Sequence, residues 1–137
     1  MKSLFKLVTI ASALAIPSMA SASLITFRVQ NQITTSAIDN TLFFGCANDT
    51  TLLPSVAPGA TSAPKVVGCG YSSSTKFEYA SSDKKCTYTI AVFYDAQYNR
   101  YNPTGAASSI GAVKATCKIL FAGADGNGNY GFVATML

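Results

Sequence analysis

The chain has 137 residues, with ten basic and six acidic side chains, and it contains neither histidine nor tryptophan. A chain of this length fits a single domain, and the lack of histidine removes the commonest general base at neutral pH and the commonest nitrogen ligand of metals. The basic residues are scattered rather than clustered, which is not the pattern of a nucleic-acid-binding face. We therefore expect a non-enzymatic protein with no nucleic-acid partner, no cofactor and no metal site.

Residues 1–22 have the pattern of a secretory signal peptide. Lys2 and Lys6 give a positive start, residues 7–16 are mainly apolar, and small residues close the segment. The apolar run is shorter than the ~20 residues that a membrane-spanning helix needs. We predict cleavage before Ser23 and a secreted or periplasmic product. Removal of the two lysines leaves eight basic against six acidic residues, so the net charge falls from +4 to +2.

Four cysteines follow the predicted cleavage site, at Cys46, Cys69, Cys86 and Cys117. An even number of cysteines in a secreted chain is typical of a disulfide framework. Three pairings of four cysteines exist, of which we favour Cys46 with Cys69 and Cys86 with Cys117. Zinc is disfavoured because the sequence has no C-x-x-C pair and no histidine to complete a mixed site.

The first half of the predicted domain contains short segments in which apolar and polar side chains alternate, as they do in half-buried strands. These predicted strands span residues 24–30, 41–46, 65–69 and 75–80. Residues 48–64 contain three prolines and one glycine, so we expect an irregular connection there, with Leu52 and Leu53 turned toward the core. The three serines at 72–74 are interpreted as an exposed loop.

Residues 86–95 are the clearest strand of the sequence, and a second alternating segment covers residues 111–121. In the first of them, one face is apolar throughout. This face consists of Cys86, Tyr88, Ile90, Val92 and Tyr94. In the second segment Cys117 falls on the apolar face, and two inward cysteines on neighbouring or facing strands can form a bond when their Cα atoms lie within about 7 Å.

The last part of the chain predicts a turn followed by a strand over residues 130–136. Asp-Gly and Asn-Gly pairs in residues 124–129 are a strong hairpin signal. Asp125, Asn127 and Asn129 also imitate the first half of a calcium-binding loop, but Tyr130 stands where that loop requires glycine. The turn is therefore the favoured interpretation.

Together these segments predict an all-β fold. Seven or eight short strands, frequent turn signals and no helical period after residue 22 indicate a small antiparallel β-sandwich, either Greek-key or immunoglobulin-like, over residues 23–137. Two disulfides would hold this single domain together.

Two short motifs resemble the opening of secreted β-sandwich families such as the thaumatin-like proteins and the aegerolysin-type cytolysins. The motif residues are Phe27, Val29 and Asn31, followed by Pro58, Gly59 and Thr61. Thaumatin-like proteins are far richer in cysteine, so the resemblance implies no activity for this chain and no role for any of its residues. Chaperone-usher pilins are similar in being secreted, disulfide-bearing sandwiches. Here Met136 stands where their last strand has an aromatic residue, and four cysteines replace the usual pair.

Residues 96–110 are predicted to form a long connection, and long loops are often functional. The candidate binding residues are Tyr98, Asn99, Arg100, Tyr101 and Asn102. Tyrosine with asparagine and arginine is the chemistry of adaptable recognition, although the same rings could pack over one end of the sandwich. We expect a binding or interaction module for a protein or glycan ligand. The alternatives are a membrane-active or envelope-associated protein, cytolysin-like in character, and a pilus-type structural subunit.

An enzyme of the glycosidase type would need two acidic side chains close together. Glu78 with Asp83, or Asp95 with Asp125, are the pairs that the sequence offers. Nothing in their spacing brings them together, and each stands beside a predicted turn, where a surface carboxylate is ordinary. We therefore predict no catalytic residues.

Overall fold

The computed structural model describes residues 23–137, and the predicted signal peptide lies outside these residues. The described part of the chain folds into eight strands. They are β1 (Ser23–Asn31), β2 (Asp39–Phe44), β3 (Lys65–Gly70), β4 (Ser73–Ser81), β5 (Lys84–Asp95), β6 (Arg100–Ser109), β7 (Cys117–Ala124) and β8 (Asn129–Met136). Within this part there is no helix with the length and hydrophobicity needed to cross a membrane.

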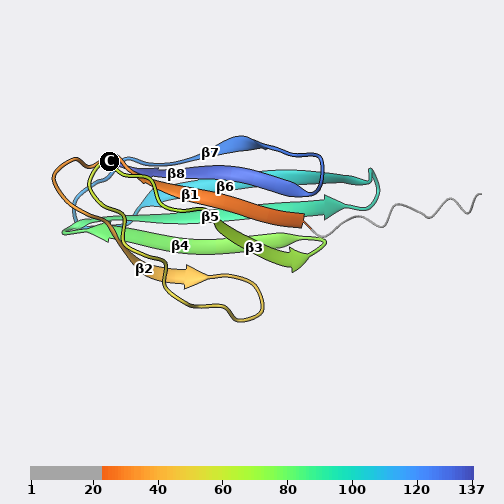
Figure 1. Ribbon diagram of the computed structural model, residues 1–137, viewed down its shortest axis with the longest axis horizontal. Coiled ribbons are helices and arrows are strands. Elements are labelled where there is room, and N and C mark those ends of the chain that lie inside the picture. The colour runs from red at the N-terminus through yellow and green to blue at the C-terminus, as the bar shows by residue number, and fades with distance from the viewer. Residues whose placement is uncertain (1–22) are drawn as a thin grey trace, which may run out of the picture.

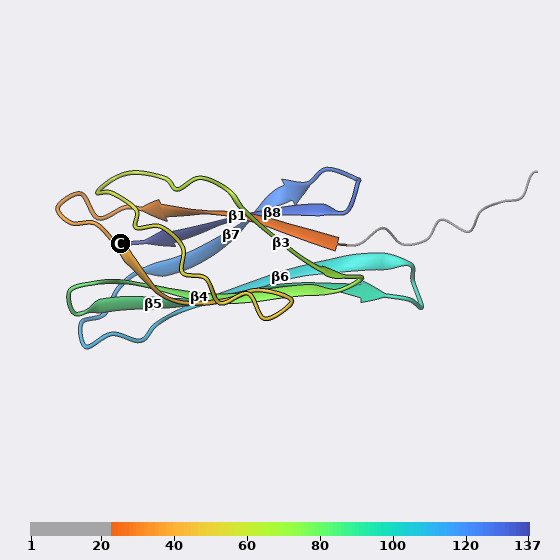
Figure 2. The same cartoon turned by 60° about the horizontal axis from the view of Figure 1, so that its bottom comes forward.

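The strands form two four-stranded sheets, which lie in two layers (Figure 2). One sheet has the order β3-β1-β8-β7 and the other the order β2-β4-β5-β6. Neighbouring strands are antiparallel except β1 and β8, which run parallel over eight residue pairs. The predicted all-β sandwich is confirmed, and the parallel pairing of the first and last strands is an addition to it.

The core lies between the inner faces of the two sheets, and β1 and β5 supply its centre. Phe27 of β1 and Tyr88 of β5 are fully buried, and both stack on Phe77 of β4, with ring centroids 4.4 and 5.0 Å apart. Burial of a side chain of this size contributes roughly 1.5–3 kcal/mol. The predicted alternation of residues 86–95 is confirmed, because Ile90 and Val92 are buried while Thr89 and Phe93 face outward.

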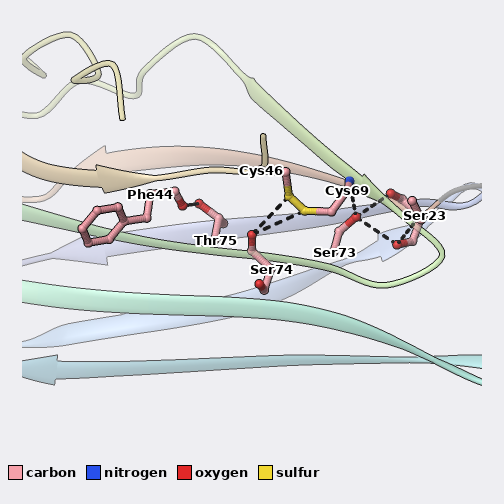
Figure 3. Close-up of a disulfide and its surroundings, with 8 residues drawn as sticks. Ser23, Phe44, Cys46, Cys69, Ser73, Ser74 and Thr75 are labelled. Atoms are coloured by element: carbon pink, nitrogen blue, oxygen red, sulfur yellow. Dashed lines mark hydrogen bonds between the residues drawn. A yellow bond between two sulfur atoms is a disulfide. The ribbon is translucent and has the colours of Figure 1, made fainter. Parts of the chain in front are cut away.

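Both predicted disulfides are confirmed. Cys46 pairs with Cys69 and Cys86 pairs with Cys117, with Cα–Cα distances of 5.2 and 5.7 Å. The first lies near the surface, where its sulfur atoms are 3.7 and 3.8 Å from the carbonyl oxygen of Ser74 (Figure 3). The second joins β5 to β7, and Cys86 is fully buried. Two disulfides are consistent with an extracellular or periplasmic protein.

The predicted long connection over residues 96–110 is wrong. Only residues 96–99 form a turn, and Arg100–Ser109 form β6, which pairs with β5 along its whole length. The asparagines, Gly105 and Pro103 in this segment favour a loop, but β6 is the outer strand of its sheet. A proline on an outer strand leaves the ladder intact when its nitrogen faces away from the neighbouring strand.

Three smaller expectations also need correction. The predicted strand over residues 111–121 begins only at Cys117, since residues 111–116 cross from one sheet to the other. Ser73 is buried at the start of β4 rather than exposed in a loop, and its hydroxyl donates to the carbonyl of Ser23 at 2.8 Å (Figure 3). Leu53 packs against the core as predicted, whereas Leu52 is exposed.

Candidate binding surface

Three turns and the start of β1 gather at one end of the sandwich (Figure 1). The turns span residues 71–72, 96–99 and 125–128, and they join β3 to β4, β5 to β6 and β7 to β8. The alternation of the strands brings inward-facing side chains from both sheets to this end. It contains the predicted binding residues, and we call it the tyrosine end.

The turn between β5 and β6 is held in one conformation by its own side chains. The Asp95 carboxylate accepts a hydrogen bond from the backbone N–H of Gln97 at 3.0 Å, and the Tyr94 hydroxyl donates to the Asn99 side-chain oxygen at 2.7 Å. Asn99 has a positive φ of 47°, a conformation that asparagine adopts more readily than most residues. The backbone of the turn is therefore already ordered, so little conformational entropy would be lost if the tip of the turn made a contact.

The tip of this turn carries Tyr98, whose side chain is 62% exposed. The guanidinium carbon of Arg100, the first residue of β6, lies 5.0 Å from the centre of the Tyr98 ring. A cation over an aromatic face at this distance is attracted to it, although only weakly where both groups are in water. The two side chains thus form one exposed unit with an apolar face and several hydrogen-bond donors.

Behind this tip, four tyrosines from different segments form a continuous tyrosine row. The row consists of Tyr71, Tyr94, Tyr101 and Tyr130. Successive ring centroids are 5.9, 5.1 and 5.6 Å apart, and the rings are tilted by 31°, 47° and 50° to one another. Tyr94 and Tyr101 are register partners in the β5–β6 hairpin, whereas Tyr130 belongs to the other sheet. The row therefore spans the gap between the sheets.

Two members of the tyrosine row, Tyr101 and Tyr130, stay uncharged at neutral pH. Desolvation raises the pKa of Tyr101, and the neighbouring Tyr94 and Tyr71 raise it further. Desolvation likewise raises the pKa of Tyr130, with added contributions from Tyr101 and from Asp125. Because an ordinary tyrosine already has a pKa of about 10, these phenols act as hydrogen-bonding groups and not as acids or bases near pH 7.

The five predicted binding residues divide into two groups. Tyr98 and Arg100 are exposed together, as expected for a contact surface. Tyr101 is partly buried and packs against the core, as expected for an aromatic that covers the end of the sandwich. Asn99 supports the turn, and Asn102 lies opposite the exposed Phe93 on the outer face of the sheet.

Sequence reasoning missed three members of the tyrosine row: Tyr71, Tyr94 and Tyr130. The alternation placed Tyr94 on the inward face. Its neighbour across the β5–β6 hairpin can be identified only when the turn between the two strands is known to be short, because the turn length fixes which residues pair. Once residues 96–99 are recognised as the turn, Tyr94 falls opposite Tyr101. Tyr71 and Tyr130 come from other segments, and nothing local in the sequence links them to this hairpin.

The acidic residues near the tyrosine end are engaged in their own turns. Asp125 accepts hydrogen bonds from the backbone N–H of Asn127 at 2.7 Å and from the Asn129 side chain at 2.6 Å. The Asn129 side chain, followed by the Asn127 backbone, lowers the pKa of Asp125. Among residues 23–137 no group of three or more histidine, cysteine, aspartate or glutamate side chains could hold a metal ion.

Comparison with known proteins gives this surface no precedent. The chain matches no protein-family model, and neither the curated proteins nor the solved structures contain a significant match to it. The chemistry of the tyrosine end therefore has to be argued from its own side chains. They offer exposed aromatic area, one cation and neutral hydrogen-bonding groups.

Proposed function

We propose that the protein is a secreted, non-enzymatic binding module whose contact surface is the tyrosine end. The observation that carries this proposal is the pairing of Tyr98 with Arg100 at the exposed tip of an internally braced turn. Tyrosine and arginine are the residue types that, with tryptophan, contribute most to the free energy of binding at protein interfaces.

The surroundings of the tip extend the area available for contact. Tyr71 and Phe93 are both more than half exposed, and each lies next to Tyr94, through a ring contact in one case and along the chain in the other. Exposed apolar area of this kind, interrupted by polar groups, is typical of interaction surfaces. Because the turn is braced before binding, little conformational entropy is lost when a ligand docks.

The geometry favours a protein ligand over a glycan. A flat sugar ring stacks best on a flat aromatic surface, whereas the tyrosine rings here are tilted by 31° to 50° to one another. An uneven aromatic surface with one arginine suits the irregular surface of a protein. A glycan remains the second ligand class that the experiment has to test.

The test compares three forms of the chain that begins at Ser23, immobilised at equal density. These are the unaltered protein, a Tyr98→Ala/Arg100→Ala variant and a Phe44→Ala control. Phe44 is also a half-exposed aromatic residue, but it lies on β2, the outer strand on the opposite side of the same sheet. Proteins from the native extracellular fluid or envelope are captured and quantified, and the same three forms are applied to a glycan array.

We expect a specific protein ligand to bind the unaltered chain and the Phe44 control equally, and to bind the double variant at least about tenfold more weakly. The thermal unfolding midpoints of the three forms should agree within a few degrees, since the replaced side chains are largely exposed. Equal capture by all three forms would exclude the tyrosine end as the contact surface. Loss of binding on the glycan array alone would assign the surface to sugars.

A further inference from the structure

β1 occupies the middle of a sheet, and within residues 23–137 a single segment connects it to the rest of the fold. It lies between β3 and β8, and the single described segment that leaves it, residues 32–38, leads to β2 in the opposite sheet (Figure 1). β8, in contrast, is held in a hairpin with β7. β1 has no hairpin partner, so its removal breaks only noncovalent contacts.

The disulfides strengthen this difference between β1 and the other strands. The Cys46–Cys69 bond ties the segment after β2 to β3, and the Cys86–Cys117 bond ties β5 to β7. Both therefore hold together the part of the chain from β2 onward. β1 contains no cysteine, and it is the one element of its sheet besides β8 without a covalent cross-link.

The pairing of β1 on its β3 side changes along its length. β3 pairs only with Ser23–Phe27, and β8 pairs in the parallel arrangement, which is slightly less stable per residue than the antiparallel one. Beyond Phe27 the free edge is covered by a loop, in which the Ser62 side-chain oxygen accepts from Val29 N–H at 2.9 Å and the Ala60 carbonyl accepts from Asn31 N–H at 2.9 Å. Next to this loop a cavity of about 250 Å³ reaches the side chains of Phe27 and Val29.

The connection from β1 to β2 also lies beside a cavity. Ile33, Thr35 and Ser36 of this connection line a second cavity of about 250 Å³, together with residues of the β4–β5 turn. Residues 32–38 are nevertheless held by several contacts: the Asn31 side chain bonds the Ser36 carbonyl and the Ile33 N–H, and Ile38 exchanges two backbone hydrogen bonds with Val56. Exchange of β1 has to break these contacts, so we expect it to require conditions close to unfolding. This segment is the one described covalent link of β1, and an exchange has to be accommodated there.

The slot that β1 fills is specific for β1. Its inward side chains Ile25, Phe27, Val29 and Asn31 are all at most 1% exposed. An empty slot would expose the apolar core and two rows of unpaired backbone groups, which strongly favours refilling it. A second copy of this chain carries a segment of the same length, register and side-chain shape.

From these observations we propose that β1 exchanges between copies of this protein, so that β1 of one copy fills the slot between β3 and β8 of another. The exchanged contacts are those seen within one chain, and only residues 32–38 change conformation. Reciprocal exchange gives a closed dimer, and head-to-tail exchange links copies into a chain. Either form is favoured by rising protein concentration.

The test uses two register partners on the outer face of the sheet, Thr26 of β1 and Val66 of β3. One batch of the chain from Ser23 carries Thr26→Cys and an isotope label, and a second batch carries Val66→Cys. The batches are mixed, concentrated and incubated just below the unfolding temperature. They are then treated with a short bismaleimide, which links free thiols and leaves the native disulfides intact. Mass spectrometry identifies labelled–unlabelled dimers.

Two controls make the result decisive. A variant that carries both Thr26→Cys and Val66→Cys in one chain shows that the linker can bridge the two positions when β1 remains paired within its own chain. A mixture of Thr26→Cys with Lys118→Cys measures random collisions, because Lys118 lies on β7 and β8 separates it from β1.

If β1 exchanges, the Thr26 and Val66 mixture gives at least tenfold more labelled–unlabelled dimer than the Lys118 control. The amount of this dimer rises with protein concentration. Light scattering then detects dimers or longer species at the same concentrations. The proposal is overturned if the double variant is bridged within one chain while the two mixtures give equal amounts of dimer. This outcome is independent of Tyr98 and Arg100, so it leaves the proposed binding surface to its own test.

Discussion

Asn31 is the polar side chain on which the end of β1 depends. It is fully buried, and its amide nitrogen donates to the carbonyl oxygens of Ser36 at 2.9 Å and of Val56 and Ala57 at 3.2 Å. Its side-chain oxygen accepts from the backbone N–H of Ile33 at 3.0 Å. One side chain thus joins the segment after β1 to residues 56 and 57 through their backbone groups.

We predict that Asn31→Ala lowers the free energy of unfolding by about 2–3 kcal/mol, because it removes the hydrogen bonds of a fully buried side chain that joins two segments of the chain. The neighbouring Gln32→Ala is the control, since Gln32 is exposed and should change stability by less than about 0.5 kcal/mol. Urea unfolding of both variants measures the difference. Equal stability of the two variants would show that water replaces the Asn31 contacts.

Predictions of the burial of single residues succeeded where the alternation within one strand determines which side chains face the core. The period of residues 86–95 placed Tyr88 and Ile90 in the core, and both are fully buried. These predictions failed where burial depends on contacts with another strand. Ser73 resembles a loop serine, yet it is buried because Ser23 of β1 and Cys69 of β3 bond to it across the gap between the sheets.

At the level of elements, β6 shows why strand prediction from local composition has a limit. Apart from Tyr101, its outward and inward positions are both small or polar, and it contains Pro103, so it has neither an apolar period nor strong strand propensity. It is a strand because β5 offers it an unpaired edge and a four-residue turn returns the chain to that edge. The candidate binding residues were therefore assigned to a loop, although three of the five, Arg100, Tyr101 and Asn102, lie in β6.

The two disulfides are predicted to differ in their contribution to stability. They close loops of similar length, with sequence separations of 23 and 31 residues, so the entropy of the unfolded chain assigns each about 3–4 kcal/mol. Cys86 is fully buried, and its replacement also removes packing in the core. We expect Cys86→Ala/Cys117→Ala to be less stable than Cys46→Ala/Cys69→Ala.

Denaturant unfolding of the two double variants, compared with the unaltered chain, checks this order. The Cys46→Ala/Cys69→Ala variant serves as the reference for loop entropy alone, since this pair lies near the surface. A reversed order of stability would mean that the surface disulfide restrains more than its own loop, for instance the irregular segment between β2 and β3.

For the molecule as a whole, the sequence predicts the layers but not their internal order. Alternation shows which side chains of a strand face the core, and four cysteines in a secreted chain indicate cross-links. Neither pattern specifies which strands are neighbours. The parallel pairing of β1 with β8 brings together residues 23–31 and 129–136, and no local signal spans that separation. The four tyrosines meet at one end of the sandwich because of this strand order, so their proximity could not be predicted from the sequence either.

The largest contributions to the alkaline pH dependence of the molecule come from two buried tyrosines, Tyr79 and Tyr88. The chain has no histidine, and its cysteines are disulfide-bonded, so none of its side chains has an ordinary pKa between about 5 and 8. Desolvation in the core raises the pKa of Tyr79 to about 12. Desolvation, followed by the influence of Tyr79, raises the pKa of Tyr88 still further. In the unfolded chain both phenols titrate near pH 10.

Because the folded pKa values lie above the unfolded ones, the stabilisation of the neutral phenols is complete below about pH 10 and is lost as the pH rises through the folded values. We therefore predict that the free energy of unfolding is nearly constant from about pH 6 to 9 and falls steadily from about pH 10 toward 12. Urea unfolding over a pH series measures it. A Tyr88→Phe variant, which loses the 2.7 Å hydrogen bond from its hydroxyl to the Thr135 carbonyl, should be less stable at neutral pH but show a shallower alkaline decline. An unchanged decline in this variant would assign the alkaline transition to groups other than Tyr88.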